Sequence, residues 1–447
     1  MNILGNFIIE SKERASHLLE HDLPVYGVDR SKGLTSNAKY KSKDTTNYKV
    51  IRPGMFAYNP MRLNIGSIAF CTSEHNIGLV SPDYIVFKCN ETVLDPVFLN
   101  YTIEGVAWQQ WIKWAGVGSV RIRIYFKELA TMPFKAPSLF DQKIITHILD
   151  SLNDKIKLNQ QMNVTLERMA QALFDSWFKN FDPVIDNALS LGNPIPEEIA
   201  KNMERRKEVL SNGNVNCEVT DLFPNAFQYT EEMGWIPKDW SLGNIGDIVK
   251  SIGGFAFKKQ AFIDSGFPVI KIKNIKGDGT VLIKGAQCIG TDEANKALKF
   301  SLRDGDLLMA MTGATVGKIG ILVIDSNNAF LNQRVAKLEG RNIENFTSFL
   351  FCFFKDQENF KKIVEIAGGS AQPNISTSGI ESVQCVIPKN DTLIKFVEIV
   401  HPYFEKWILN YKQSNILSNL CETLLPKLIS GEISIFDAEL LNEEVYT

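Results

Sequence analysis

The sequence has few cysteines, no long apolar run and little net charge, and each of these absences excludes a class of protein. None of its seven cysteines belongs to a C-x-x-C pair, so we expect reduced thiols in a cytosolic protein instead of a disulfide scaffold. No apolar run approaches the roughly 18 residues that span a bilayer, and the N-terminus lacks the basic start of a secretory signal. We therefore expect a cytoplasmic protein that binds no membrane. A net charge of −3 means that any nucleic-acid binding must come from local basic patches.

Catalytic signatures are also missing. The stretch 313–319 is similar to a phosphate-binding loop, but it has three residues between its glycines where four are required, and isoleucine where Ser or Thr must bind Mg²⁺. The stretch 59–62 (NPMR) lacks the second proline and the aromatic residue that amino-methyltransferases stack on a flipped base. His17 to His21 match a zinc motif in letters, but Pro24 ends the expected helix too early. We predict no catalytic residue, no cofactor and no metal site in this chain.

One long helix is predicted in the first half of the chain. Ser138 and Asp141 form a capping signal, and about forty residues follow without Pro or Gly. Apolar residues recur at the four-three spacing of a coiled coil, with two asparagines in the same seam. We predict a helix over 138–180 that needs a partner helix. Its seam consists of Ile145, Leu149, Leu152, Ile156, Asn159, Asn163, Leu166, Ala170, Leu173 and Trp177.

The partner helix is predicted in the same chain, at a constant offset of 251 residues. Adding 251 to each seam position gives Phe396, Val400, Tyr403, Trp407, Asn410, Ser414, Leu417, Cys421, Leu424 and Leu428. Upstream, Arg52 matches Arg303 and Gly66 matches Gly317 at the same offset. The shared offset predicts a tandem duplication of a globular domain followed by a long helix, whereas two unrelated amphipathic helices are the plainer alternative. Pro402 has Ser151 as its counterpart and is expected to kink or restart the second helix.

This repeat predicts the fold class and the domain plan. The class is α+β, with two globular mixed α/β domains joined by two long antiparallel coiled-coil helices. The predicted segments are a first domain (1–137), a first helix (138–180), a linker with one short charged helix (181–232), a second domain (233–388), a second helix (389–430) and a tail (431–447).

Each predicted globular domain contains a stretch rich in basic residues. Residues 30–52 hold seven basic residues against one acid, and residues 250–276 hold six lysines against Asp264. Lys and Arg amid Ser, Thr and Asn suit contacts with phosphates and base edges. A solvated loop is a fair alternative for either stretch alone, and the occurrence of one stretch in each copy favours nucleic-acid binding.

Five segments together resemble the specificity (S) subunit of type I restriction-modification systems. They are LFDSWFKNFDPV (173–184), GWIPKDW (234–240), GDLL with TGA (305–314), GSAQ (369–372) and LLPKLISGEI (424–433). Each motif is modest alone, but their order and the half-repeat make the set specific. The resemblance covers nearly the whole chain.

The resemblance implies a non-catalytic DNA reader within a methyltransferase and endonuclease complex. In this family two target-recognition domains each read one half of a split double-stranded DNA target. The two helices pair antiparallel, set the spacing of the domains and dock two methyltransferase (M) subunits, and restriction (R) subunits complete a cutting complex. S-adenosylmethionine, Mg²⁺ and ATP are implied for the partner subunits. Two other classes stay open: a coiled-coil scaffold that binds proteins, and an enzyme acting alone.

Polar and basic residues in matched loops are the predicted DNA contacts, because Arg reads guanine and Asn or Gln reads adenine in the major groove. They are Lys39, Lys41, Lys43, Arg121 and Arg123 in the first domain, and Lys258, Lys259, Thr312, Thr315, Lys318, Gln372 and Asn374 in the second. The asparagines of the helix seam are expected to set its register. The predicted seam and docking residues are Leu149, Leu152, Ile156, Asn159, Asn163, Leu173, Trp177, Val400, Tyr403, Trp407, Asn410 and Leu424.

Overall fold

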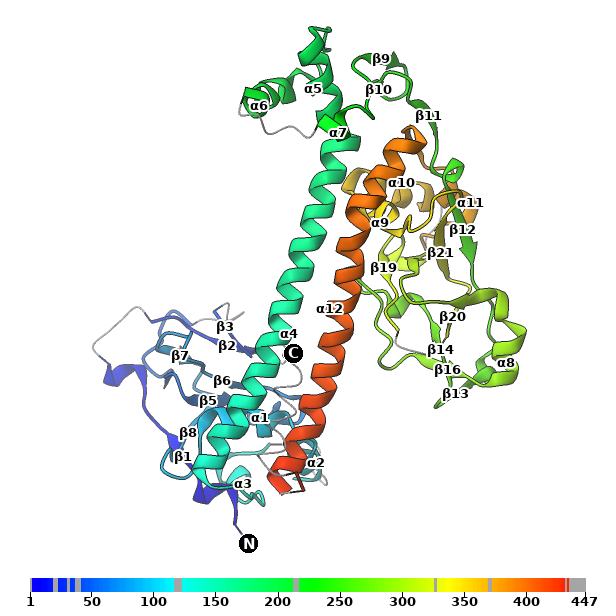
Figure 1. The fold of residues 1–447 in the computed structure, drawn as a ribbon. Coiled ribbons are helices and arrows are strands. Elements are labelled where there is room, and N and C mark those ends of the chain that lie inside the picture. The colour runs from blue at the N-terminus through cyan, green and yellow to red at the C-terminus, as the bar shows by residue number, and fades with distance from the viewer. Residues whose placement is uncertain are drawn as a thin grey trace. The chain divides into compact units, whose positions relative to one another are not determined.

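Two compact units make up the chain in the computed structural model: residues 1–157 with 415–447, and residues 158–414. The structure describes residues 2–18, 23–29, 33–36, 42–115, 123–211, 217–324, 328–368, 372–430 and 432–433. Both units combine helices with small sheets, which confirms the predicted mixture of helix and strand (Figure 1). Among the described residues, no helix is long and apolar enough to cross a membrane.

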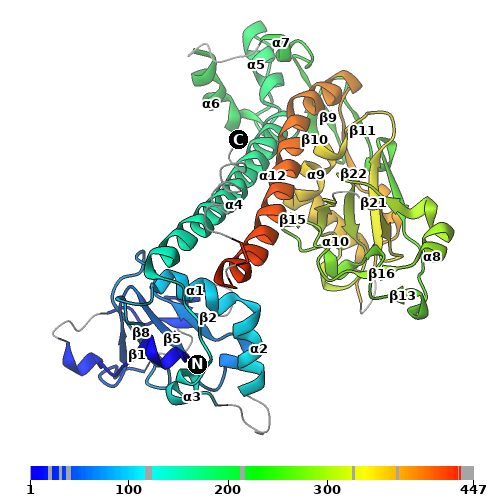
Figure 2. The same cartoon turned by 60° about the horizontal axis from the view of Figure 1, so that its bottom comes forward.

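The first unit is built on a four-stranded antiparallel sheet in the order β1-β8-β5-β6. Figure 2 labels three of these strands, β1, β8 and β5. Two strand pairs, β2–β3 and β4–β7, and three helices complete the unit. The strands are β1 (Ile8–Ser11), β2 (Gly27–Asp29), β3 (Gly33–Thr35), β4 (Lys49–Ile51), β5 (Met55–Tyr58), β6 (Ile68–Phe70), β7 (Gly78–Val80) and β8 (Ile85–Cys89); the helices are α1 (Pro96–Glu104), α2 (Val106–Ala115) and α3 (Phe126–Ala130).

Strand β5 divides the core of the first unit into two sides, because successive side chains of a strand point to opposite faces. Phe56 and Tyr58 are fully buried in a cluster that includes residues of α1, α2 and α3. Ala57 between them lies in a different cluster with Ile51 and Val80. The sheet is therefore covered on both faces, by helices on one side and by the small strand pairs on the other.

The second unit contains two five-stranded sheets, β12-β21-β18-β19-β15 and β13-β16-β14-β20-β17. The first sheet consists of β12 (Val249–Gly253), β21 (Val335–Gly340), β18 (Leu307–Ala310), β19 (Ile319–Ile321) and β15 (Gly279–Thr280). The second consists of β13 (Phe262–Ile263), β16 (Gln287–Ile289), β14 (Phe267–Ile270), β20 (Ala329–Leu331) and β17 (Ser301–Leu302). Strand pairs β9 (Phe227–Thr230)–β10 (Gly234–Pro237) and β11 (Ser241–Asn244)–β22 (Gln384–Ile387) flank them, with helices α8 (Thr291–Lys296), α9 (Thr347–Lys355), α10 (Gln357–Ala367) and α11 (Thr377–Glu381).

The same alternation organises the second core. Leu307 and Met309 of β18 face a cluster that contains α9, α10 and the long helices, whereas Leu308 and Ala310 face the second sheet. All four side chains are fully buried. The first sheet is thus the middle layer of this unit, and the loops at one end of its strands form the candidate site.

Two long helices, α4 (Leu139–Phe174) and α12 (Asn390–Ser430), run through both units. The Ser138 hydroxyl accepts a hydrogen bond from the Asp141 N–H at 3.1 Å, as the capping signal predicts. In the first unit Leu149 and Leu152 share a core with Leu424 and Leu428. After Phe174, residues Asp175–Lys179 continue as a π-helical turn.

The prediction that the second helix restarts at Pro402 is wrong, because α12 continues through this residue. A proline in a helix interior costs about 3 kcal/mol through its missing N–H and its ring. Neighbouring Val400 is fully buried and Phe404 is nearly so. Packing of these side chains on the core holds the helix together across the proline.

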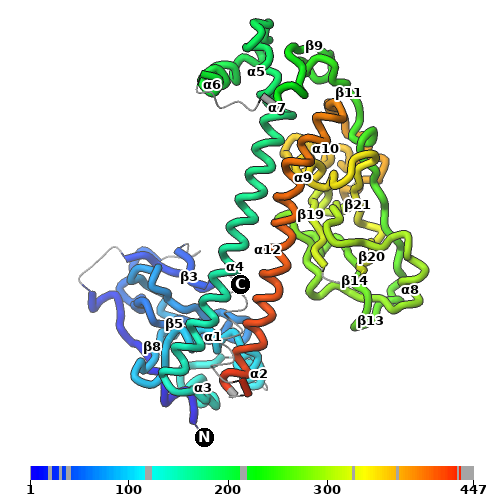
Figure 3. Tube along the Cα trace, viewed as in Figure 1, coloured from blue at the N-terminus to red at the C-terminus, as the bar shows by residue number. Residues whose placement is uncertain are grey.

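The segment predicted as a linker (181–232) contains three helices: α5 (Asp182–Leu191), α6 (Ala200–Ser211) and α7 (Cys217–Thr220) (Figure 3). Pro183 lies in the first turn of α5, where a missing N–H breaks no helical hydrogen bond. Ion pairs join α6 to α5, from Arg205 to Asp182 at 2.8 Å and from Arg206 to Asp186. Both aspartates are buried, so these pairs hold the segment as a small helical layer.

Element bounds in the second unit repeat those of the first at the predicted offset. Adding 251 to the bounds of β6, β7, α1 and α3 gives the bounds of β19, β20, α9 and α11. The pair Val50↔Leu79 of β4–β7 likewise corresponds to Ser301↔Phe330 of β17–β20. A tandem duplication would produce this agreement, and it stays a prediction about the origin of the chain.

Candidate nucleic-acid interface

One end of the first sheet in the second unit gathers five chain segments. The strand register pairs Gly253 with Ala336, Val335 with Ala310, Met309 with Ile319 and Gly279 with Gly320. The end of β12, the start of β21, the end of β18 and the starts of β19 and β15 therefore lie side by side. We call the segments at this edge the sheet-end loops: residues 254–259, 276–278, 311–318, 332–334 and 372–377.

Backbone contacts join these loops to one another. The Gly313 N–H donates to the Pro373 carbonyl at 2.9 Å, and Thr312 and Asn374 form an antiparallel bridge. The Met311 N–H donates to the Arg334 carbonyl at 3.0 Å, which links two further loops. Because their backbone polar groups bind each other, these loops present side chains from a fixed frame.

The structure brings together most of the residues predicted as DNA contacts in the second domain. Gln372 and Asn374 are exposed beside the 311–318 loop, in which Thr315 and Lys318 are partly exposed. Lys258 and Lys259 are exposed just beyond β12. Thr312 is only 3% exposed, so its side chain cannot reach a base edge in this conformation and its prediction as a contact is dropped.

The cations of this region are largely unneutralised. Lys296 and Lys337 pair with acids, but among the described residues Lys258, Lys259 and Lys318 have no ion pair. Burial of Lys271, reinforced by the nearby charge of Lys273, lowers the pKa of Lys271. Uncompensated positive charge suits the binding of a polyanion.

Sequence reasoning missed two polar residues in this cluster, Gln333 and Arg334. They lie in the turn 332–334 between β20 and β21, and both are exposed. The signal was available as an Asn-Gln-Arg run between two apolar strand runs, which is typical of a turn that displays polar side chains. The prediction rested on lysine-rich stretches and left this short run out.

The first unit has a corresponding edge at the ends of β1, β5, β6 and β8, because the register pairs Ser11 with Val86 and Tyr58 with both Ile85 and Ile68. The Ile124 N–H donates to the Pro60 carbonyl at 3.0 Å, as the Ile375 N–H does to the Met311 carbonyl at 2.9 Å. This edge holds a cleft of about 680 Å³. The cleft is lined by Glu10, Lys49, Pro60, Met61, Pro82, Asp83, Ile85, Arg123, Tyr125, Phe126, Lys127 and Glu128.

Several known proteins are similar to this chain. The family described as "Type I restriction modification DNA specificity domain" matches residues 237–418. The type I restriction enzyme HindI specificity subunit of Haemophilus influenzae is 24% identical over 412 residues, covering 86% of this chain and 88% of that protein. The chain is thus similar over most of its length to type I specificity subunits, and residues 237–418 match their DNA specificity domain. These relatives are specificity subunits, which are non-catalytic, and the similarity supports a role in recognition of DNA sequence.

Two further similarities are more distant. The MjaIX specificity subunit of Methanocaldococcus jannaschii is 24% identical over 345 residues, covering 76% of this chain and 69% of that protein. The crystal structure of the type I S subunit from M. genitalium aligns with a TM-score of 0.48 and 14% identity, over 96% of this chain and 95% of that one. A score this low does not by itself establish a shared arrangement.

The DNA contacts predicted in the first unit lie only partly within the described residues. Lys43 is exposed, and Arg123 is exposed with its guanidinium donating to the Tyr125 hydroxyl at 3.5 Å. Lys39, Lys41 and Arg121 lie outside the described residues. In the cleft, burial lowers the pKa of Lys49, whose ammonium group donates to the Tyr84 carbonyl at 2.6 Å.

The predicted docking residues mostly form the internal seam of the helices. Eight of these side chains are buried: Leu149, Leu152, Asn159, Trp177, Val400, Trp407, Asn410 and Leu424. Leu173 is half-buried and packs against the same core as Trp177. Ile156, Asn163 and Tyr403 are half-buried. Most of the predicted docking side chains therefore pack inside the molecule and offer little surface to a partner.

Asparagines of the seam bind one another in the second unit. Asn410 Nδ2 donates to Asn163 Oδ1 at 2.9 Å, and Asn163 Nδ2 donates to the Trp407 carbonyl at 3.1 Å. Asn159 Nδ2 donates to Gln413 Oε1 at 3.0 Å. A later residue in α4 thus contacts an earlier residue in α12, because Asn159 binds Gln413 whereas Asn163 binds Trp407. The two helices are therefore antiparallel within this unit.

Replacement of both Asn159 and Asn410 by leucine is expected to raise the melting temperature but loosen the pairing, because buried amides are exchanged for apolar contacts without a fixed register. Circular dichroism melts measure the first effect, and hydrogen exchange along α4 measures the second. Thr165→Leu on the exposed face of α4 is the control, and a lower melting temperature in the double variant would contradict the prediction.

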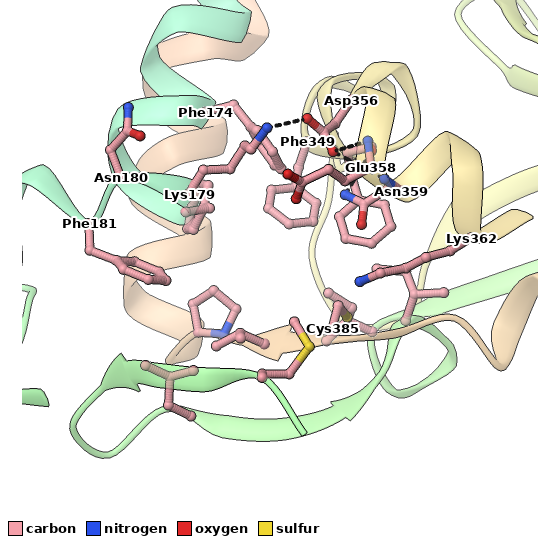
Figure 4. A pocket seen from close by; sticks show the side chains of 18 of the residues that line it. Phe174, Lys179, Asn180, Phe181, Phe349, Asp356, Glu358, Asn359, Lys362 and Cys385 are labelled. Atoms are coloured by element: carbon pink, nitrogen blue, oxygen red, sulfur yellow. Dashed lines mark hydrogen bonds and ion pairs between the residues drawn. The ribbon is translucent and has the colours of Figure 1, made fainter. Parts of the chain in front are cut away.

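A second hollow lies beside Lys179, Asn180 and Phe181, just after the π-helical turn that follows α4 (Figure 4). Its volume is about 410 Å³, with Phe174, Phe349 and Phe353 in its walls. Lys179 Nζ lies 2.6 Å from Asp356, whose carboxylate also caps α10 by accepting from the Glu358 N–H. Burial raises the pKa of the Cys385 thiol in this hollow to about 12, so it has little thiolate near neutral pH and is a poor nucleophile.

Proposed function

We propose that each unit of this specificity subunit reads one half of a bipartite double-stranded DNA target. The observation that carries the proposal is the recurrence of the same edge in both units. Ile124 binds Pro60 in one unit as Ile375 binds Met311 in the other, and each contact brings a predicted DNA-reading loop onto the sheet end. Exposed cations without acid partners in the second unit supply phosphate contacts, and polar side chains beside them supply base contacts.

The long helices are proposed to space the two reading units and to dock two methyltransferase subunits. Leu158, Val164 and Met169 of α4 and Leu409 of α12 are each about half exposed, which supports their contact with partner helices. The methyltransferase subunits would bring S-adenosylmethionine to adenine in each half-site. Restriction subunits, where present, would add ATP-dependent cutting.

The decisive experiment maps N6-methyladenine across the host genome with this chain present and deleted. We expect deletion to erase methylation at one split motif, consisting of two short blocks around a fixed unspecified spacer. An unchanged map in a strain that expresses the methyltransferase subunit would contradict the proposal. Mobility-shift assays with the purified chain then separate the remaining classes, because a reader retards duplex DNA without turning it over, whereas a scaffold does not retard it.

A further inference from the structure

The turn 332–334 is held by backbone hydrogen bonds on every side. The Asn332 N–H donates to the Ile270 carbonyl at 3.1 Å, and the Gln333 N–H donates to the Phe255 carbonyl at 3.0 Å. The Arg334 carbonyl accepts from Met311, and the Val335 N–H donates to the Asn332 carbonyl at 2.9 Å. Three of these hydrogen bonds reach other segments, at Ile270, Phe255 and Met311, and the fourth closes the turn on itself, so the backbone of the turn is fixed.

Glycine makes this close packing possible. A Cβ atom at Gly254 would lie 2.3 Å from the Asn332 carbonyl oxygen and 2.6 Å from the Leu331 carbonyl oxygen. Any larger residue would push the 254–259 loop away from the turn. The backbones of the 254–259 loop and the 332–334 turn are therefore in close contact, and this contact requires glycine at position 254.

Two donors project from this fixed turn. Gln333 and Arg334 are both exposed, while Asn332 is buried. Within the described part of the chain, Arg334 makes no ion pair or side-chain hydrogen bond.

The arginine at the other end of the same strand is different. Arg341 Nε donates to the Gly246 carbonyl at 2.6 Å and the Val249 carbonyl at 3.0 Å, and its guanidinium lies 3.5 Å from Glu381. Arg341 thus has structural partners, whereas the guanidinium of Arg334 keeps all of its donors available.

We propose that Arg334 and Gln333 read bases in the half-site bound by the second unit. The inference rests on the proposed DNA-reading function and names the readers within it. A guanidinium forms two hydrogen bonds with guanine O6 and N7, and a carboxamide forms two with adenine N6 and N7. Lys258 and Lys318 on neighbouring sheet-end loops are suited to the flanking phosphates.

The first unit offers different chemistry at the matching place. Positions 332–334 correspond, at the offset of 251, to Ser81, Pro82 and Asp83. Asp83 lines the cleft of that unit, and a carboxylate accepts from cytosine N4 but repels phosphate. The two half-sites should therefore differ at the bases that these turns contact.

Selection from a pool of randomised duplexes by the full chain, with and without its methyltransferase subunit, tests the proposal. We expect the parent chain to enrich a split motif with guanine at one fixed position. Arg334→Ala should reduce the preference for that guanine by about 5- to 150-fold, and Arg334→Lys should restore it only in part. The affinity of the Arg334→Ala variant for duplexes that lack the motif, and the salt dependence of that affinity, should change little.

The controls separate the alternatives. Arg341→Ala should lower the melting temperature and leave the enriched motif unchanged. If Arg334→Ala enriches the parental motif, or weakens binding to all duplexes equally, the assignment of base reading is overturned while the DNA-reading function stands. A parent chain that enriches no motif in either setting overturns both.

Discussion

Charge reversal of Lys258, Lys259 and Lys318 to glutamate is expected to weaken DNA binding at every sequence, on the order of tenfold to a hundredfold. These side chains are exposed or partly exposed at one sheet edge, and no described acid neutralises them. Each lost phosphate contact should reduce the slope of log affinity against log salt by about 0.9, so the triple variant should lose roughly 3 from the slope. Fluorescence anisotropy with a duplex at several salt concentrations measures both effects.

Reversal of Lys201 and Lys406 provides a control in which two charges change instead of three. Both are exposed lysines on helices, away from the sheet-end loops. Their reversal to glutamate changes the net charge of the chain in the same direction and should alter the salt slope far less. If the control variant and the loop variant lose affinity equally, the effect comes from overall charge, and the loops are not the binding surface.

Replacement of Phe396 by alanine is expected to destabilise the second unit by about 3–5 kcal/mol. Phe396 is fully buried, and its ring lies 5.1 Å from Phe178, 5.7 Å from Trp177 and 5.9 Å from Phe349. Phe396, near the start of α12, therefore packs in one aromatic cluster with the π-helical turn after α4 and with α9. For a unit of this size the melting temperature should fall by roughly 6–20 °C, measured by tryptophan fluorescence.

Phe140→Ala is the corresponding control, because Phe140 is 73% exposed at the start of α4. It removes the same atoms without leaving a cavity, and we expect its melting temperature to match that of the parent. A fall of less than about 2 °C for Phe396→Ala would show that the cluster relaxes around the gap, contrary to the expectation for a close-packed core.

The helix seam and the mixed fold were readable from the sequence because they follow from periodicity. Leu149, Leu152, Leu424 and Leu428 recur at coiled-coil spacing, and they are buried together in the first unit. The restart expected at Pro402 does not occur. Sequence rules count only the free-energy cost of proline in a helix, whereas the burial of Val400 and Phe404 in the core offsets that cost. The helices within 181–232 were underestimated for a similar reason, since buried ion pairs between α5 and α6 hold them in place.

The candidate site was only partly accessible to sequence reasoning. Lys258 and Lys318 stood out by composition, but nothing local shows that Thr312 is buried or that Arg334 lies beside the Met311 backbone. These facts depend on strand register, which joins residues more than twenty positions apart in the sequence.

The sequence by itself determined the resemblance to specificity subunits, the long helices and the lack of catalytic signatures, because motif order and hydrophobic period are local properties of the chain. The tertiary structure alone decided which polar residues share one surface and which are buried. Antiparallel pairing of β18 with β21 and β19 brings separate loops to one edge. This pairing also places Arg334, whose guanidinium has no partner among the described residues, and Arg341, whose Nε donates to two backbone carbonyls, at opposite ends of β21.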